Sequence, residues 1–61
     1  MNSEYQVGVE EDGNLFFDGP SFDNILLAIE YAKKNYNHAT IYYYNWKIVA
    51  EWDIFKGVKI G

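Results

Sequence analysis

The sequence predicts a small α+β domain in which one helix packs on one face of an antiparallel sheet, in the order ββαββ. Three observations support this two-layer arrangement. Residues 4–10 alternate between apolar and polar side chains, and residues 22–36 repeat their apolar side chains with a helical period. Residues 39–53 are rich in β-branched and aromatic side chains. A chain of 61 residues forms one domain, residues 1–61, and buries only about 60% of its surface on folding.

The first hairpin is predicted from the alternation over residues 4–10 and from the turn that follows it. Asp12-Gly13 is a strong hairpin signal because glycine adopts positive φ at no steric cost. Residues 15–17 then form a second, short strand. Gly19 and Pro20 are expected to end that strand, because proline cannot donate a hydrogen bond to a ladder.

The helix is predicted over residues 22–36, with the Ser21 hydroxyl as its N-cap acceptor. Asn35 or Asn37 is the expected C-terminal residue, because asparagine tolerates the left-handed conformation. The helical period places one apolar stripe on the core side. The opposite side of the helix carries Asp23, Leu27, Glu30, Tyr31 and Lys34.

The C-terminal part is predicted to form a second hairpin, with strands over residues 39–44 and 47–53. Asn45-Trp46 is the expected two-residue turn between them. Residues 55–61 form a tail or an added short strand. Helix and sheet are expected to share one core, made mainly of Val7, Val9, Phe17, Ile25, Ile29, Ile41, Tyr43 and Ile48.

Catalytic, cofactor and metal sites are not expected in this composition. His38 is the only histidine, there is no cysteine, and Ser21 is explained as a helix cap. A nucleophile also needs a base and an orienting group in one cleft, which a chain this short hardly forms. The acidic segment 10–14 is not a calcium loop, because position six of that loop requires glycine and here is Leu15.

Charge divides the chain into two halves. Residues 1–32 contain seven acidic residues and no lysine, whereas residues 33–61 contain five lysines and two acidic residues. The net charge of −4 and the absence of arginine argue against direct binding of nucleic acid, which depends on cationic side chains. No apolar run approaches the roughly 20 residues that span a bilayer, and residues 1–4 lack signal-peptide features. We therefore expect a cytoplasmic protein that does not bind membranes.

Aromatic side chains exceed what a thin core can cover. Because Tyr42, Tyr43 and Tyr44 are consecutive, an alternating strand must turn at least one of them away from the helix. Aromatic anchors surrounded by polar groups are typical of protein–protein interfaces. The candidate partner-binding residues are Glu10, Glu11, Asp12, Asp18, Asp23, Leu27, Glu30, Tyr31, Tyr42, Tyr44 and Trp46.

The strand over residues 5–9, the acidic turn 11–13 and the helix start at residues 21–23 together resemble a known group. They are similar in plan to small acidic phage-encoded proteins that mimic DNA, nearest to the inhibitors of uracil-DNA glycosylase. The resemblance covers about half of the chain, and the hairpin over residues 39–53 is additional to that plan. It implies a protein that inhibits or regulates a nucleic-acid-handling enzyme by occupying its DNA-binding surface, with carboxylates where phosphates would lie. The many residues with AT-rich codons agree with a low-GC bacterium or its phage.

A structural or regulatory homo-oligomer is the alternative. In that hypothesis, the aromatic face of the sheet forms a symmetric contact, or the lysines around Lys47 and Lys56 meet the acidic half of a second copy, as in a homodimer. An enzyme or a small-ligand binder is the third class, and no convergent polar pocket can be assembled for it from the sequence.

Overall fold

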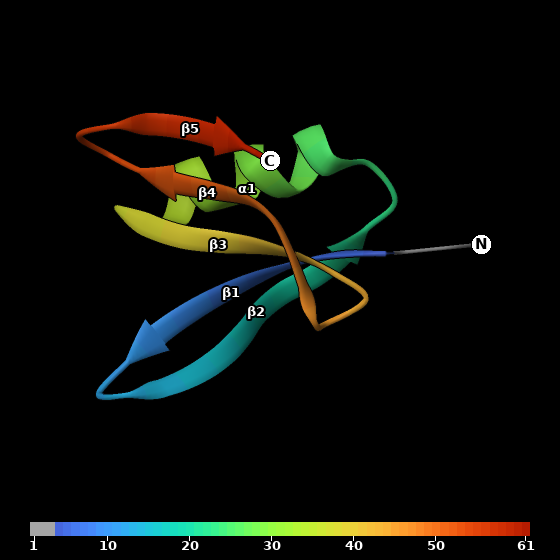
Figure 1. Cartoon of the computed structure of the whole chain (residues 1–61), viewed down its shortest axis with the longest axis horizontal. Coiled ribbons are helices and arrows are strands. Elements are labelled where there is room, and N and C mark those ends of the chain that lie inside the picture. The colour runs from blue at the N-terminus through green and yellow to red at the C-terminus, as the bar shows by residue number, and fades with distance from the viewer. Residues whose placement is uncertain (1–3) are drawn as a thin grey trace.

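Five antiparallel strands form one sheet in residues 4–61, the part of the chain that the structure, a computed structural model, describes. The strands lie side by side in the order β2-β1-β3-β4-β5 (Figure 1). One helix, α1, follows the first hairpin. The elements are β1 Tyr5–Glu11, β2 Asn14–Phe22, α1 Ile25–Asn35, β3 His38–Tyr43, β4 Lys47–Asp53 and β5 Gly57–Ile60.

The predicted two-layer ββαββ arrangement is wrong. The described chain follows the order ββαβββ, with 57% of its residues in the single sheet and one short helix. The difference is β5, which pairs with β4 through Trp52↔Val58 and Glu51↔Lys59. Gly57 adopts a φ of 83°, which lets the chain turn back after β4. From the sequence, this segment was expected to form either a tail or an added short strand.

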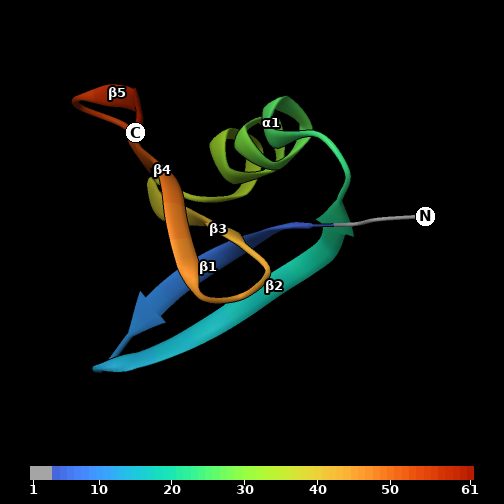
Figure 2. The same cartoon turned by 45° about the vertical axis from the view of Figure 1, so that its right-hand side comes forward.

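The helix covers only part of one face of the sheet, and the other face carries no packed element among the described residues (Figure 2). The core between helix and sheet contains Val7, Ala28, Ile29, Ala32, Ala39, Ile41 and Ala50. Four of these are alanines, none of which is among the main core residues predicted from the sequence. Small side chains on both elements allow the helix backbone to approach the sheet closely, so aromatic residues lie at the margins of this core.

The predicted core is confirmed for Val7, Ile29 and Ile41, which are buried. Val9, Ile25 and Tyr43 are partly buried. Two members of the prediction, Phe17 and Ile48, are wrong: their side chains are 43% and 48% exposed on the uncovered face.

Strand pairing explains both errors. Phe17 pairs with Gly8, on the opposite face of β1 from the buried Val7. The register of β3 and β4 shifts between Ile41↔Ala50 and Tyr42↔Ile48. One extra residue in β4 at this bulge interrupts the alternation, so Ile48 and Ala50 do not share a face.

The second strand is longer than predicted, because it continues through Gly19 and Pro20 to Phe22. Among residues 4–61, β2 is an edge strand that pairs with β1 alone, so a proline without N–H is tolerated. The register shifts between Tyr5↔Phe22 and Val7↔Asp18, and Gly19 takes up the irregularity with a φ of 79°.

The helix begins about one turn later than predicted. Its N-cap is Asn24, whose side-chain oxygen accepts from the backbone N–H of Leu26 at 2.8 Å, whereas Ser21 lies in β2. The helix ends at Asn35, and Tyr36 follows in an extended conformation with φ −140°. The prediction of Asn35 as the C-terminal residue is confirmed, but neither Asn35 nor Asn37 adopts the left-handed conformation expected there.

The turn between β3 and β4 contains three residues, Tyr44, Asn45 and Trp46, where a two-residue turn was expected. Tyr44 and Asn45 have φ values of 55° and 70°, a conformation that tyrosine rarely adopts. Tyr44 is held there because its N–H donates to the Glu4 carbonyl at 2.7 Å and its ring meets that of Tyr43 edge-on.

Candidate protein-binding surface

The strand order places the acidic first hairpin and the lysines of β4 and β5 on opposite sides of the sheet. Because β2 and β1 lie together at one side of the sheet, the acidic first hairpin is separated by β3 from the lysine-bearing β4 and β5 (Figure 1). The first hairpin contributes four acidic side chains and no lysine. We call this set the acidic hairpin; it consists of Glu10, Glu11, Asp12 and Asp18.

The turn of the acidic hairpin holds three of these carboxylates on a defined backbone. Asp12 and Gly13 have φ values of 54° and 81°, as a two-residue type I′ turn requires. Glu10 pairs with Leu15 on the uncovered face, so Glu11, its neighbour, lies on the helix side. The three acidic residues are exposed at one end of the sheet.

Asp18 is engaged within the molecule. Its Oδ2 accepts from the hydroxyl of Tyr36 and, at 3.4 Å, from the hydroxyl of Tyr31. The hydrogen bond to Asp18, followed by desolvation, raises the pKa of Tyr36 to about 12. Desolvation and the charge of Asp18 also raise the pKa of Tyr31. Asp18 therefore joins the edge strand β2 to α1 and to the residue that follows it.

The candidate residues predicted on the helix differ in their accessibility, and Asp23 precedes α1, because the helix begins at Ile25. Leu27 is 52% exposed, and Asp23 and Glu30 are exposed as well. Tyr31 is half-buried, with its ring 5.7 Å from that of Phe22. Leu27 and Glu30 are thus available to a partner, whereas Tyr31 packs α1 onto the end of β2.

An apolar cluster occupies the uncovered face of the sheet. The rings of Phe17 and Tyr42 meet edge-on at 5.3 Å. Tyr42 lies across Gly8, where a Cβ atom would come within 2.6 Å of the tyrosine ring. We call this set the open-face cluster; it consists of Leu15, Phe17, Tyr42 and Ile48. Tyr42 is among the partner-binding residues predicted from the sequence, whereas Phe17 and Ile48 were predicted in the core.

Tyr44 and Trp46 lie at the other end of the sheet from the acidic turn, in the β3–β4 connection (Figure 1). Trp46 is 75% exposed. The backbone N–H of Asn45 donates to the side-chain oxygen of Gln6 at 3.1 Å, which joins this turn to β1. The candidate residues of the sequence analysis therefore occupy separate regions and do not form one continuous patch.

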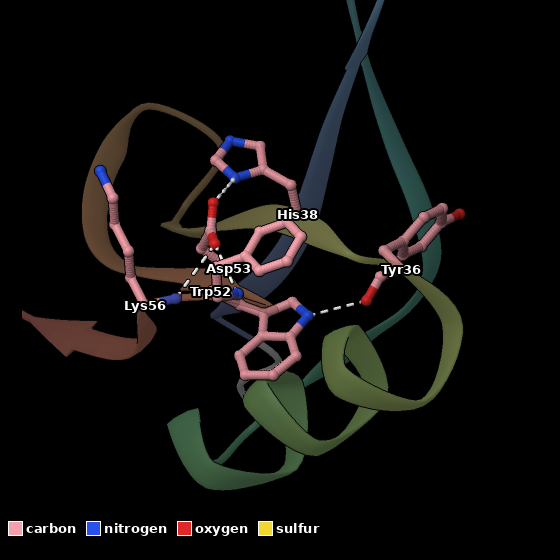
Figure 3. A network of polar contacts seen from close by, with 6 residues as sticks. Tyr36, His38, Trp52, Asp53 and Lys56 are labelled. Atoms are coloured by element: carbon pink, nitrogen blue, oxygen red, sulfur yellow. Dashed lines mark hydrogen bonds and ion pairs between the residues drawn. The ribbon is translucent and has the colours of Figure 1, made fainter.

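The β4–β5 turn presents an aromatic side chain that the sequence analysis missed. Asp53 Oδ1 accepts from the backbone N–H of Phe55 at 2.8 Å and from that of Lys56 at 3.1 Å (Figure 3). His38 Nδ1 lies 3.5 Å from Asp53 Oδ2. Phe55 is 93% exposed on this fixed turn. The sequence signal for this turn is Asp53, two residues before Phe55, together with Gly57 after it.

Trp52 anchors the same hairpin to the helix. Its indole N–H donates to the Tyr36 carbonyl at 2.7 Å (Figure 3), and the Lys33 ammonium lies 5.8 Å from the ring centre. The sheet at this end is therefore fixed to α1 on one side, while the turn beyond it projects outward.

A cavity of about 370 Å³ lies beside this turn, lined by Glu51, Asp53, Lys56, Gly57 and Lys59.

The hydrogen bonds to Asp53 have a measurable consequence for stability. The backbone N–H groups of Phe55 and Lys56 lower the pKa of this carboxyl from its ordinary value of 3.8, and His38 adds to the effect. Folding therefore favours the charged carboxylate. The stability that this charge contributes is fully present above the ordinary pKa and is lost as the pH falls through the lowered pKa of the folded protein. We expect Asp53→Asn, which keeps an oxygen acceptor, to lower Tm less than Asp53→Ala.

Thermal unfolding followed by circular dichroism tests this expectation. The Tm difference between the wild type and Asp53→Asn should be largest near neutral pH and should shrink as the pH falls through the lowered pKa of the Asp53 carboxyl. Glu51→Gln on the same strand serves as the control. A Tm difference that does not change with pH would show that the charge of Asp53 does not stabilise the turn.

Comparison with known proteins identifies no relative: no family model, curated protein or solved structure matches the chain. Residues 4–61 contain no group of three histidine, cysteine or acidic side chains placed to hold a metal ion. Within the same residues, the helix is too short and too polar to cross a membrane.

Proposed function

We propose that the chain is a protein-binding domain without catalytic residues that inhibits or regulates a nucleic-acid-handling enzyme by occupying its DNA-binding surface. The observation that supports this proposal is the acidic hairpin, which gathers Glu10, Glu11 and Asp12 at one side of the sheet, away from the lysines of β4 and β5. A surface that binds DNA presents cations spaced for phosphates. Carboxylates on a rigid hairpin meet such a surface with complementary charge.

Exposed apolar side chains would supply the short-range part of the contact, one on the acidic hairpin and one in the first turn of α1. Phe16 lies on β2, and Leu27 lies on the outer side of α1; both are about half-exposed. Charge complementarity speeds association, while burial of such anchors slows dissociation. DNA itself carries no apolar anchor of this kind, so a mimic with both features competes effectively with DNA.

The test is capture of the partner with the tagged protein from a low-GC bacterial lysate, followed by mass spectrometry and a salt series on the purified complex. We expect a basic protein that binds nucleic acid. Its affinity for this chain should fall on the order of tenfold between about 50 mM and 200 mM salt, because screening weakens exposed charge pairs. An affinity that is independent of salt would overturn the proposal.

A homo-oligomer is the second candidate function, and the open-face cluster favours it. Leu15, Phe17 and Ile48 are exposed, and Tyr42 is partly buried beside them, on a sheet face that no described element covers. A second copy packed on this face would bury them symmetrically. Sedimentation at micromolar concentration separates the two candidates, because a strict monomer contradicts the oligomer.

A further inference from the structure

The outer edge of β2 is unpaired in the described chain. β2 lies at the end of the sheet and pairs only with β1, and eight of its nine residues are exposed. The edge of a strand presents backbone N–H and C=O groups that a further strand can pair with. The opposite edge of the sheet, β5, offers only four residues.

The first half of β2 lacks the features that usually protect an edge strand. Proteins block such edges with lysines, prolines, bulges or short strands. Here Gly19, Pro20 and the register shift lie toward the helix end of β2, which leaves residues 14–18 regularly paired with β1. Leu15, Phe16 and Phe17 are consecutive in this part and are 43–52% exposed.

The acidic side chains on and beside β2 limit which segments can pair with its outer edge. The acidic hairpin places Glu11, Asp12 and Asp18 on or beside β2, and neither β1 nor β2 contains lysine. Pairing with β2 of a second copy would bring two acidic hairpins together, which costs free energy. Pairing with β5 of a second copy would be head-to-tail and would use a strand of only four residues. A basic segment from another protein is the complementary partner.

We propose that residues 14–18 of β2 take an extended segment of the partner protein, with alternating apolar and basic side chains, as a sixth strand of the sheet. This inference rests on the proposed function and specifies how the partner is held. One face of the added strand would pack beside Leu15 and Phe17, and the other beside Phe16. Main-chain hydrogen bonds supply affinity, and the alternating side chains supply specificity.

The probe is a capped synthetic peptide of alternating lysine and valine or isoleucine, titrated into the isotope-labelled protein and followed by NMR. We expect amide shifts centred on residues 14–18 and slower hydrogen exchange there. A peptide N-methylated at alternate backbone positions along its pairing edge should bind at least about tenfold more weakly, because it cannot donate to β2. Phe16→Lys should weaken binding through like charge, whereas Ile60→Lys on the opposite edge should leave it unchanged.

Three results would overturn the inference: shifts centred elsewhere, no shifts up to millimolar peptide, or equal binding of the N-methylated peptide. Self-pairing of the protein through residues 14–18 would also overturn it. These outcomes are separable from failure of the proposed function. If binding depends on salt but is unchanged by N-methylation, the charge-based function remains supported and the sixth strand is excluded. If the affinity for the natural partner is independent of salt, the proposed function itself is excluded.

Discussion

Ile41→Ala is expected to leave the protein largely unfolded at room temperature. Ile41 is fully buried at the centre of the core, on the strand in the middle of the sheet. Truncation of such a side chain costs about 2–5 kcal/mol, while the core of a domain this small supplies only about 3–5 kcal/mol of net stability. Urea unfolding followed by circular dichroism measures the loss.

Ile60→Ala is the matched control for this experiment. It makes the same change of side chain in a strand, but Ile60 is exposed on the edge strand β5. We expect the free energy of unfolding to change by no more than about 0.5 kcal/mol. If Ile41→Ala cost no more than Ile60→Ala, Ile41 would not lie at the centre of the core.

Neutralising the turn of the acidic hairpin is expected to give the largest loss of partner binding. The triple variant Glu10→Gln, Glu11→Gln and Asp12→Asn keeps side-chain size and hydrogen-bonding oxygens but removes three exposed charges. Asn tolerates the left-handed conformation of position 12, so the turn is retained. We expect an affinity on the order of a hundredfold lower at low salt, with little change in Tm, as exposed charged side chains contribute little to folding.

Glu51→Gln on β4 is the control for this variant, because it removes one carboxylate outside the acidic hairpin. Its affinity should stay within about twofold of that of the wild type. The remaining salt dependence of the triple variant should also be shallower, because fewer charge pairs form. If the triple variant bound as tightly as the wild type, the acidic turn would not belong to the interface.

Local patterns in the sequence predicted several elements correctly. Alternation over residues 4–10 identified β1, and Asp12-Gly13 identified its turn because only a few residues adopt positive φ easily. The buried Val7, Ile29 and Ile41 followed from the periods of their strand and helix.

Errors arose where tertiary context overrode a local signal. Ser21 and Asn24 are both good N-caps, and the choice between them depended on β2 continuing across Gly19 and Pro20, which only an edge strand allows. The exposure of Ile48 depended on a bulge that leaves no mark in the composition of β4.

The candidate surface was predictable in its chemistry but not in its geometry. The charge division was visible in the sequence, yet only the strand order shows that it becomes a division in space. Tyr42 was selected correctly as a ring on the uncovered face, whereas Tyr31 is half-buried and packs against Phe22. Phe55 was missed, because its exposure depends on the Asp53 turn that precedes β5.

Competition between duplex DNA and this chain for the captured partner tests the central claim most directly. The partner is titrated with the labelled protein, and unlabelled duplex DNA is then added at low salt. If the acidic hairpin occupies a DNA-binding surface, DNA should displace the chain completely, and the chain should weaken DNA binding by the same factor, as mutually exclusive binding requires. A ternary complex in which DNA and the chain bind the partner together without loss of affinity would contradict the claim.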